Sequence, residues 1–123
     1  MQFSHLKNLA QMVRYIVHSE FGIGMKRFAF YETEEYKEWL KTQALKSQRQ
    51  ILDRLLKIEE ESHFGHHKYL KEDVWELKFN DGRRVYYGFV RKFNIILLLG
   101  GNKNGQDKDI KKATKIFRKI AEG

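Results

Sequence analysis

Cysteine and proline are both absent from the 123 residues of this chain. Without cysteine, the chain can form neither a disulfide nor a zinc site with cysteine ligands, which fits a reducing compartment. Long apolar runs are absent too, since no stretch approaches the roughly 20 residues needed to cross a bilayer. Lys7, Arg14 and Glu20 interrupt the region where a signal peptide would carry its apolar core. We therefore expect a cytoplasmic protein without a membrane segment.

Apolar and basic residues, in contrast, are plentiful. The apolar set makes up 41% of the chain and aromatics 14%, which is enough for the core of one modest domain and argues against disorder. Lys and Arg total 24 against 16 acidic residues, a formal net charge of +8. An excess of this size in a small domain favours a polyanionic partner, nucleic acid first. The alternative is charge that only keeps the protein soluble.

Residues 1–24 are predicted to form an N-terminal helical extension, ahead of a single domain over residues 25–123. Apolar residues recur at helical spacing in this extension, and they are Leu6, Leu9, Ala10, Val13, Ile16 and Val17. Gly22 and Gly24 follow, as glycines commonly do at the end of a helix. We expect this extra helix to pack on the domain or on a second copy, which would give a homodimer.

The domain is predicted to begin with a strand over residues 26–31 and then a helical hairpin. Phe28 and Phe30 alternate with other residues in the strand, and Thr33 is a good helix N-cap. The buried stripes of the two helices are predicted to be Tyr36, Trp39, Leu40 and Ala44, followed by Ile51, Leu52, Leu55, Leu56 and Ile58. Residues 61–68 are interpreted as a polar loop.

Three strands and a last helix follow in the prediction. Trp75, Leu77 and Phe79 alternate with polar residues, and Asn80-Asp81-Gly82 is a strong hairpin signal. A second alternating strand leads to an apolar run over residues 94–99, which is typical of a strand buried on both faces. Residues 100–105 are expected to turn, and the helix to start at about Asp107. The order predicts an α+β fold, an antiparallel (mixed) β-sheet packed on the helical hairpin with its helices on one face.

One face of this sheet carries the candidate chemistry. If the apolar residues of the hairpin strands face the core, Glu76, Lys78, Arg84 and Tyr86 share the other face, which we expect to be exposed. Lys103 follows the third strand, at the rim of the same patch. Cleaving RNA by internal attack needs a base for the 2′-hydroxyl and cations for the phosphorane, and these residues supply both types of group. A solvated face with cross-strand ion pairs is the alternative interpretation.

Further cations are candidate RNA contacts around this patch, and they are Lys68, Lys71, Arg83, Lys108 and Lys112. The lysines near the end of the chain equally fit the solvated face of the last helix. His63, His66 and His67 match no standard zinc spacing, so a solvated loop is favoured over a metal site. We expect neither metal nor cofactor.

Three segments of the chain resemble one protein family. VWELKFNDGRRVYYGF, IILLLGGNKNGQDKDIKKA and the earlier YETEEYKEWLK are similar to the RelE/ParE superfamily of type II toxins. The resemblance is greatest to the HigB-like branch of phage-derived addiction-module killer proteins, and it covers about residues 27–120. It implies a small RelE-like domain over residues 25–123, a cognate antitoxin of helix-turn-helix type and, in many members, metal-independent cleavage of mRNA on the ribosome.

Individual positions follow from the same resemblance. Arg84 matches the arginine of the central strand, and Lys103 matches the basic residue after the last strand. Lys78 stands where this branch more often shows arginine. Lysine keeps the positive charge but cannot form the two parallel hydrogen bonds of a guanidinium. The tyrosine that better-known members place near Asp109 is missing, and Gln106 and Asp109 are interpreted as caps of the last helix.

The leading hypothesis is therefore an mRNA interferase, an endoribonuclease that arrests translation and is neutralised by its antitoxin. Two alternatives stay open. The same fold supports a ParE-like toxin that inhibits DNA gyrase without cutting nucleic acid. An inactive homologue that only binds its antitoxin, or a plain nucleic-acid-binding module, would also fit these residues.

Overall fold

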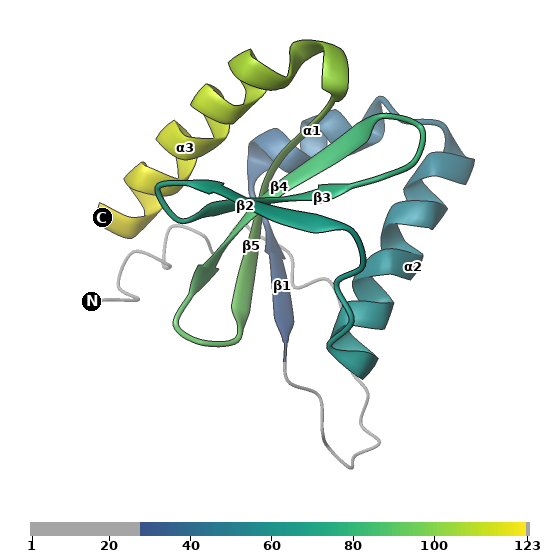
Figure 1. Cartoon of the computed structure of the whole chain (residues 1–123), viewed down its shortest axis with the longest axis horizontal. Coiled ribbons are helices and arrows are strands. Elements are labelled where there is room, and N and C mark those ends of the chain that lie inside the picture. The colour runs from purple at the N-terminus through teal and green to yellow at the C-terminus, as the bar shows by residue number, and fades with distance from the viewer. Residues whose placement is uncertain (1–27, 123) are drawn as a thin grey trace.

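The computed structural model describes residues 28–122, arranged as an α+β domain (Figure 1). The predicted N-terminal extension lies outside the described residues. Strand β1 (Ala29–Glu32) leads to helices α1 (Glu34–Lys41) and α2 (Leu45–Glu61). Strands β2 (His67–Lys71), β3 (Val74–Lys78), β4 (Arg83–Val90) and β5 (Asn94–Asn102) follow, and a 3₁₀ turn (Lys103–Gly105) leads into helix α3 (Gln106–Glu122). No helix in this part of the chain is long and apolar enough to cross a membrane.

The strands form one five-stranded sheet in the order β1-β5-β4-β3-β2. Strand β1 runs parallel to β5, and the other neighbours pair antiparallel, so the sheet is mixed. The predicted α+β class is confirmed, but β2 was not predicted, and the polar loop expected over residues 61–68 overlaps its first two residues. This edge strand is mostly exposed, so its sequence HKYLK lacks the apolar alternation that marks a half-buried strand.

Helices cover both faces of the sheet, and the expectation that they share one face is wrong. Helices α1 and α2 close one core, which is formed around Ile51, Leu55, Leu77 and Val85. Helix α3 lies on the opposite face (Figure 1) and places Phe117 over a second core. Strand β5 supplies both cores, as its apolar run predicted, because successive side chains of a strand point to opposite faces.

Glycine at position 88 allows α3 to approach the sheet closely. A Cβ atom at Gly88 would lie 2.7 Å from a ring carbon of Phe117. Any larger residue there would push the ring, and the helix that carries it, away from β4. The position of α3 therefore depends on a residue without a side chain in the middle of a strand.

Local signals in the sequence predicted several boundaries correctly. Thr33 caps α1, since its Oγ1 accepts a hydrogen bond from the backbone N–H of Tyr36 at 3.0 Å. The same hydroxyl lies 2.9 Å from the carbonyl of Leu98, which ties the start of α1 to β5. Ala44 is an exposed N-cap of α2 rather than a buried helix residue, and Leu52 is 37% exposed.

The predicted turns also lie close to their places in the structure. Asn80-Asp81-Gly82 joins β3 to β4, with Gly82 at a φ of 97° where glycine is strongly favoured. Strand β5 continues to Asn102, so the expected turn at residue 100 is shorter than predicted. Helix α3 begins at Gln106, one residue before the predicted start.

Candidate active site

A buried carboxylate, Glu76, lies at the centre of the candidate site. Its side chain has no exposed surface, and its Oε1 accepts a hydrogen bond of 2.8 Å from the amide of Gln106. The Nε of Arg84 lies 3.8 Å from Oε1, and the Nζ of Lys78 lies 4.0 Å from Oε2. Burying a carboxylate is costly unless it is paired with cations and hydrogen bonds, and these neighbours offset that cost.

Strand register brings the four predicted residues of this face together. Lys78 lies opposite Arg84, and Glu76 lies opposite Tyr86, across the β3–β4 pair. The expectation that the face is exposed is wrong, because Tyr86, like Glu76, is fully buried. Gln106, the first residue of α3, covers Glu76, so the start of the last helix hides the centre of the face from solvent.

Three polar atoms in this cluster are buried without a hydrogen-bond partner among residues 28–122. They are Oε2 of Glu76, Nε of Arg84 and the hydroxyl oxygen of Tyr86. The distances from Glu76 to its two cations suit ion pairs but are too long for hydrogen bonds. Folded proteins pair nearly all such atoms with protein groups or with ordered water, so these three atoms mark a place where a water molecule or a ligand can bind.

The protonation of Tyr86 and Asp109 follows from their surroundings. Burial raises the pKa of the Tyr86 phenol, and the negative charges of Glu76 and Asp109 raise it further. Tyr86 is therefore a neutral hydrogen-bond donor, which removes it as the candidate base and leaves Glu76. Burial also raises the pKa of Asp109, while Lys112 and Lys108 oppose this shift.

Asp109 lies directly over strand β5. A Cβ atom at Gly101 would collide with the Oδ2 of Asp109, so this close approach requires glycine. The structure thus adds Gln106 and Asp109, from the first turn of α3, to the predicted cluster. Their sequence positions suggested helix caps only, because the contact between Gln106 and Glu76 spans 30 residues of chain.

The other predicted cations have different positions around the cluster. Lys68 lies opposite Glu76 across the β2–β3 pair. Lys68 and Lys71 line a groove of about 400 Å³ between β2 and α3, with Ile110 on the α3 side. Lys108 and Lys112 are exposed on α3 beside Asp109.

Lys103 and Arg83 lie at the β3–β4 hairpin. Lys103 is exposed, and its side-chain carbons would lie 3.6 to 3.7 Å from a Cβ atom at Gly82. Arg83 points to the opposite face of the sheet, where its guanidinium binds Asp81 and Gln50. The structure therefore does not bring Arg83 to the Glu76 cluster.

The histidines lie away from this cluster. His67 stacks on Trp75, with 5.5 Å between ring centroids, and its Nδ1 lies 3.3 Å from the hydroxyl of Tyr87. Burial lowers the pKa of His67, and the charges of Arg54 and His66 add to this. Within the described part of the chain, no three His, Cys, Asp or Glu side chains gather where they could hold a metal ion.

This chain is similar to a protein family, to a relative in another organism and to a solved structure. Residues 38–119 match the family described as phage-derived protein Gp49-like (DUF891). An uncharacterised protein of Haemophilus influenzae is 32% identical over 91 residues, which make up 72% of this chain and 91% of that protein. The crystal structure of the isolated E. coli RelE toxin matches with a TM-score of 0.51 at 14% identity, covering 69% of this chain and 96% of RelE. At that identity the likeness shows the fold.

Proposed function

This chain belongs to the Gp49-like family of phage-derived proteins within the RelE/ParE superfamily, and on that premise we propose that it is the toxin of a type II toxin–antitoxin pair. Family and fold together support a toxin of this type, which implies an antitoxin partner. The finer proposal is a cytoplasmic, HigB-like mRNA endonuclease that acts on the ribosome without a metal. Its antitoxin would be a helix-turn-helix protein.

The Glu76 cluster is the observation that carries the nuclease proposal. A buried carboxylate with two cations within 4.0 Å, and with unpaired donors beside it, suits general-base catalysis next to a phosphate. A solvated surface would place such groups in water, where each would have partners. Buried polar atoms without partners lower stability and do nothing for solubility. Three of them at one place therefore favour a functional reason for the cluster.

Each residue of the cluster has a role in the proposed reaction. Glu76 takes the proton of the RNA 2′-hydroxyl, whose oxygen then attacks the adjacent phosphorus while the bond to the 5′-oxygen breaks. Arg84 and Lys78 stabilise the charge that develops on the phosphoryl oxygens. The neutral Tyr86 donates a hydrogen bond to the same group.

The remaining step concerns the leaving 5′-oxygen. It takes a proton from water, with Lys103 stabilising its charge from the hairpin side. Glu76 has no exposed surface, so RNA reaches it only when Gln106 and the first turn of α3 move aside. The cations on β2 and α3, among them Lys68 and Lys112, would contact flanking phosphates.

Expression of Arg84→Ala in a bacterium, beside the unchanged protein, tests this proposal. Mapping of mRNA 5′ ends should reveal new cuts inside translated frames with the unchanged protein. Removing one donor that stabilises developing charge typically lowers a rate by about 100- to 1000-fold, so the variant should lose the cuts. Arg49→Ala is the matched control, because it removes the same charge from an exposed position of α2.

The outcomes separate the candidate functions. Growth arrest with cuts that are lost in Arg84→Ala and kept in Arg49→Ala supports the nuclease. Growth arrest without new cuts in mRNA would contradict it and favour a gyrase-type target. No arrest at all would favour an inactive homologue that binds only its antitoxin.

A further inference from the structure

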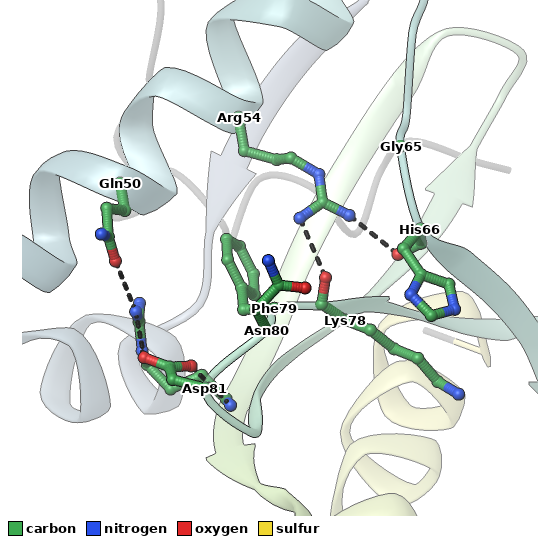
Figure 2. A pocket seen from close by; sticks show the side chains of 9 residues that line it. Gln50, Arg54, Gly65, His66, Lys78, Phe79, Asn80 and Asp81 are labelled. Atoms are coloured by element: carbon green, nitrogen blue, oxygen red, sulfur yellow. Dashed lines mark hydrogen bonds and ion pairs between the residues drawn. The ribbon is translucent and has the colours of Figure 1, made fainter.

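A second groove lies between α2 and the β3–β4 hairpin, and we call it the hairpin groove (Figure 2). Its volume is about 430 Å³, which lies within the usual range of roughly 300 to 1,000 Å³ for small-molecule sites. Its walls include Arg54 of α2, His66 before β2, and Phe79 and Asn80 of the hairpin. The role proposed for the Glu76 cluster makes no use of this groove.

Arg54 gives the hairpin groove a rigid frame. Its guanidinium donates hydrogen bonds to three backbone carbonyls, those of Phe64 at 2.9 Å, His66 at 2.8 Å and Lys78 at 3.0 Å. These bonds tie α2 to the segment before β2 and to the end of β3 (Figure 2). The groove therefore exists before any ligand arrives.

The floor of the hairpin groove combines one aromatic ring with two cations. The guanidinium carbon of Arg54 lies 4.7 Å from the ring centroid of Phe79, and that of Arg83 lies 5.3 Å from it. Arg83 is itself held by Asp81 and Gln50. A planar, electron-rich group next to a negative charge suits such a surface.

Two side chains at the groove keep their hydrogen-bonding groups free. Among residues 28–122, neither Asn80 nor His66 has a side-chain hydrogen bond, and both are exposed. An asparagine amide offers a donor and an acceptor side by side, which pair with two atoms on the edge of a nucleobase. An imidazole ring stacks on bases.

We propose that the hairpin groove binds one nucleotide unit of single-stranded RNA, with Asn80 reading the base and the nearby cations attracting the phosphate. The proposal rests on the nuclease function for its choice of RNA, and it extends that function by a specificity site. Lys78 links the two places, because its carbonyl is bound by Arg54 at the groove while its ammonium lies 4.0 Å from Glu76. Figure 2 shows the Lys78 side chain leading away from Arg54. The groove and Glu76 lie on opposite faces of the sheet, so a bound RNA strand would pass around the hairpin edge at Lys78 from one to the other.

Amide NMR spectra of the full chain test this inference without requiring cleavage. The probes are AMP, GMP, CMP and UMP, inorganic phosphate, and a 2′-O-methyl tetranucleotide that cannot undergo internal attack. We expect saturable shifts at the amides of residues 65–66 and 79–82. The tetranucleotide should bind at least about tenfold more tightly than the best mononucleotide, since it adds phosphate contacts.

Variants of exposed residues supply the controls. Asn80→Ala should weaken binding of the preferred base by roughly 5- to 150-fold, the range for a lost bidentate base contact, and should level the preference among bases. His66→Ala should weaken stacking, while His63→Ala, a matched change at an exposed position of the same segment, should leave binding unaltered. All three positions are exposed, so folding should be unaffected.

Each result bears on the inference separately from the nuclease proposal. Shifts absent from the groove amides with every probe would overturn it, even if the protein cuts mRNA. Equal affinity for a mononucleotide and the tetranucleotide would indicate a site for free nucleotides and overturn the assignment to RNA. Tetranucleotide binding in the groove by a protein that cuts no mRNA would support the inference and contradict the nuclease alone.

Discussion

Replacing Glu76 with glutamine measures what the buried carboxylate contributes to stability and to the proposed chemistry. The glutamine retains a carbonyl oxygen that can accept the 2.8 Å hydrogen bond from Gln106, and it matches the volume of the original side chain. What it loses is the negative charge between Lys78 and Arg84. It also loses the ability to accept a proton from a 2′-hydroxyl.

The distances in the cluster set the expected effect on stability. At an effective dielectric constant of 20, a pair of unit charges about 4 Å apart attract by about 4 kcal/mol, and Glu76 has two such partners at 3.8 and 4.0 Å. Against this stands a desolvation penalty of several kcal/mol for each buried ion. Glutamine regains only the penalty of the carboxylate itself, and it leaves Lys78 and Arg84 without the negative charge that offsets their own burial. We therefore expect Glu76→Gln to lower the free energy of unfolding by about 3 to 5 kcal/mol.

Urea denaturation followed by circular dichroism measures this stability, and Glu60→Gln on the exposed side of α2 is the matched control. Cleavage of mRNA on translating ribosomes measures the activity, which should fall at least about 100-fold with the general base removed. An unchanged free energy of unfolding would refute the reasoning, because it would mean that Lys78 and Arg84 do not depend on the charge of Glu76. Full activity in a stable Glu76→Gln protein would refute the assignment of the base.

Two further predictions concern the packing of α3. Gly88→Ala should lower the free energy of unfolding by about 1 to 3 kcal/mol in urea titrations, because the new Cβ collides with the ring of Phe117. An unchanged midpoint of urea unfolding would mean that α3 can move away from the sheet at no cost, and it would contradict the prediction. Asp109→Asn should raise stability at neutral pH, since burial raises the pKa of Asp109 above its unfolded value and its ionisation then costs stability. This gain should vanish as the pH falls below the ordinary pKa of aspartate, and a gain that persists in acid would contradict burial of the charge as its cause.

The Glu76 cluster shows what strand alternation predicts correctly and what it does not predict. Strand alternation predicted that Glu76, Lys78, Arg84 and Tyr86 share a face, because side chains two residues apart point the same way and the hairpin turn sets the register. The same reasoning predicted an exposed face. It failed there because alternation says which residues share a face, whereas long-range packing decides what covers that face.

Other features that the sequence does not reveal depend on long-range packing in the same way. The strand β2 was missed because an exposed edge strand carries almost no apolar signal, and its identity depends on backbone pairing with β3. The direction of the Arg83 side chain also depends on the tertiary structure, because its guanidinium binds Asp81 and Gln50 at the hairpin groove, on the face away from Glu76. Charge alone does not reveal the direction in which a side chain points.

The sequence by itself determined the class of this protein and most of its elements. Helical spacing, the Thr33 cap, the Asn80–Gly82 turn and the apolar run of β5 are local signals, and each acts within a few residues. Tertiary structure alone decided that α3 lies over the sheet, that Gln106 binds Glu76 and that Arg54 frames the hairpin groove. These hydrogen bonds join residues 10 to 30 positions apart, and the free energy that each contributes depends on burial that no local pattern encodes.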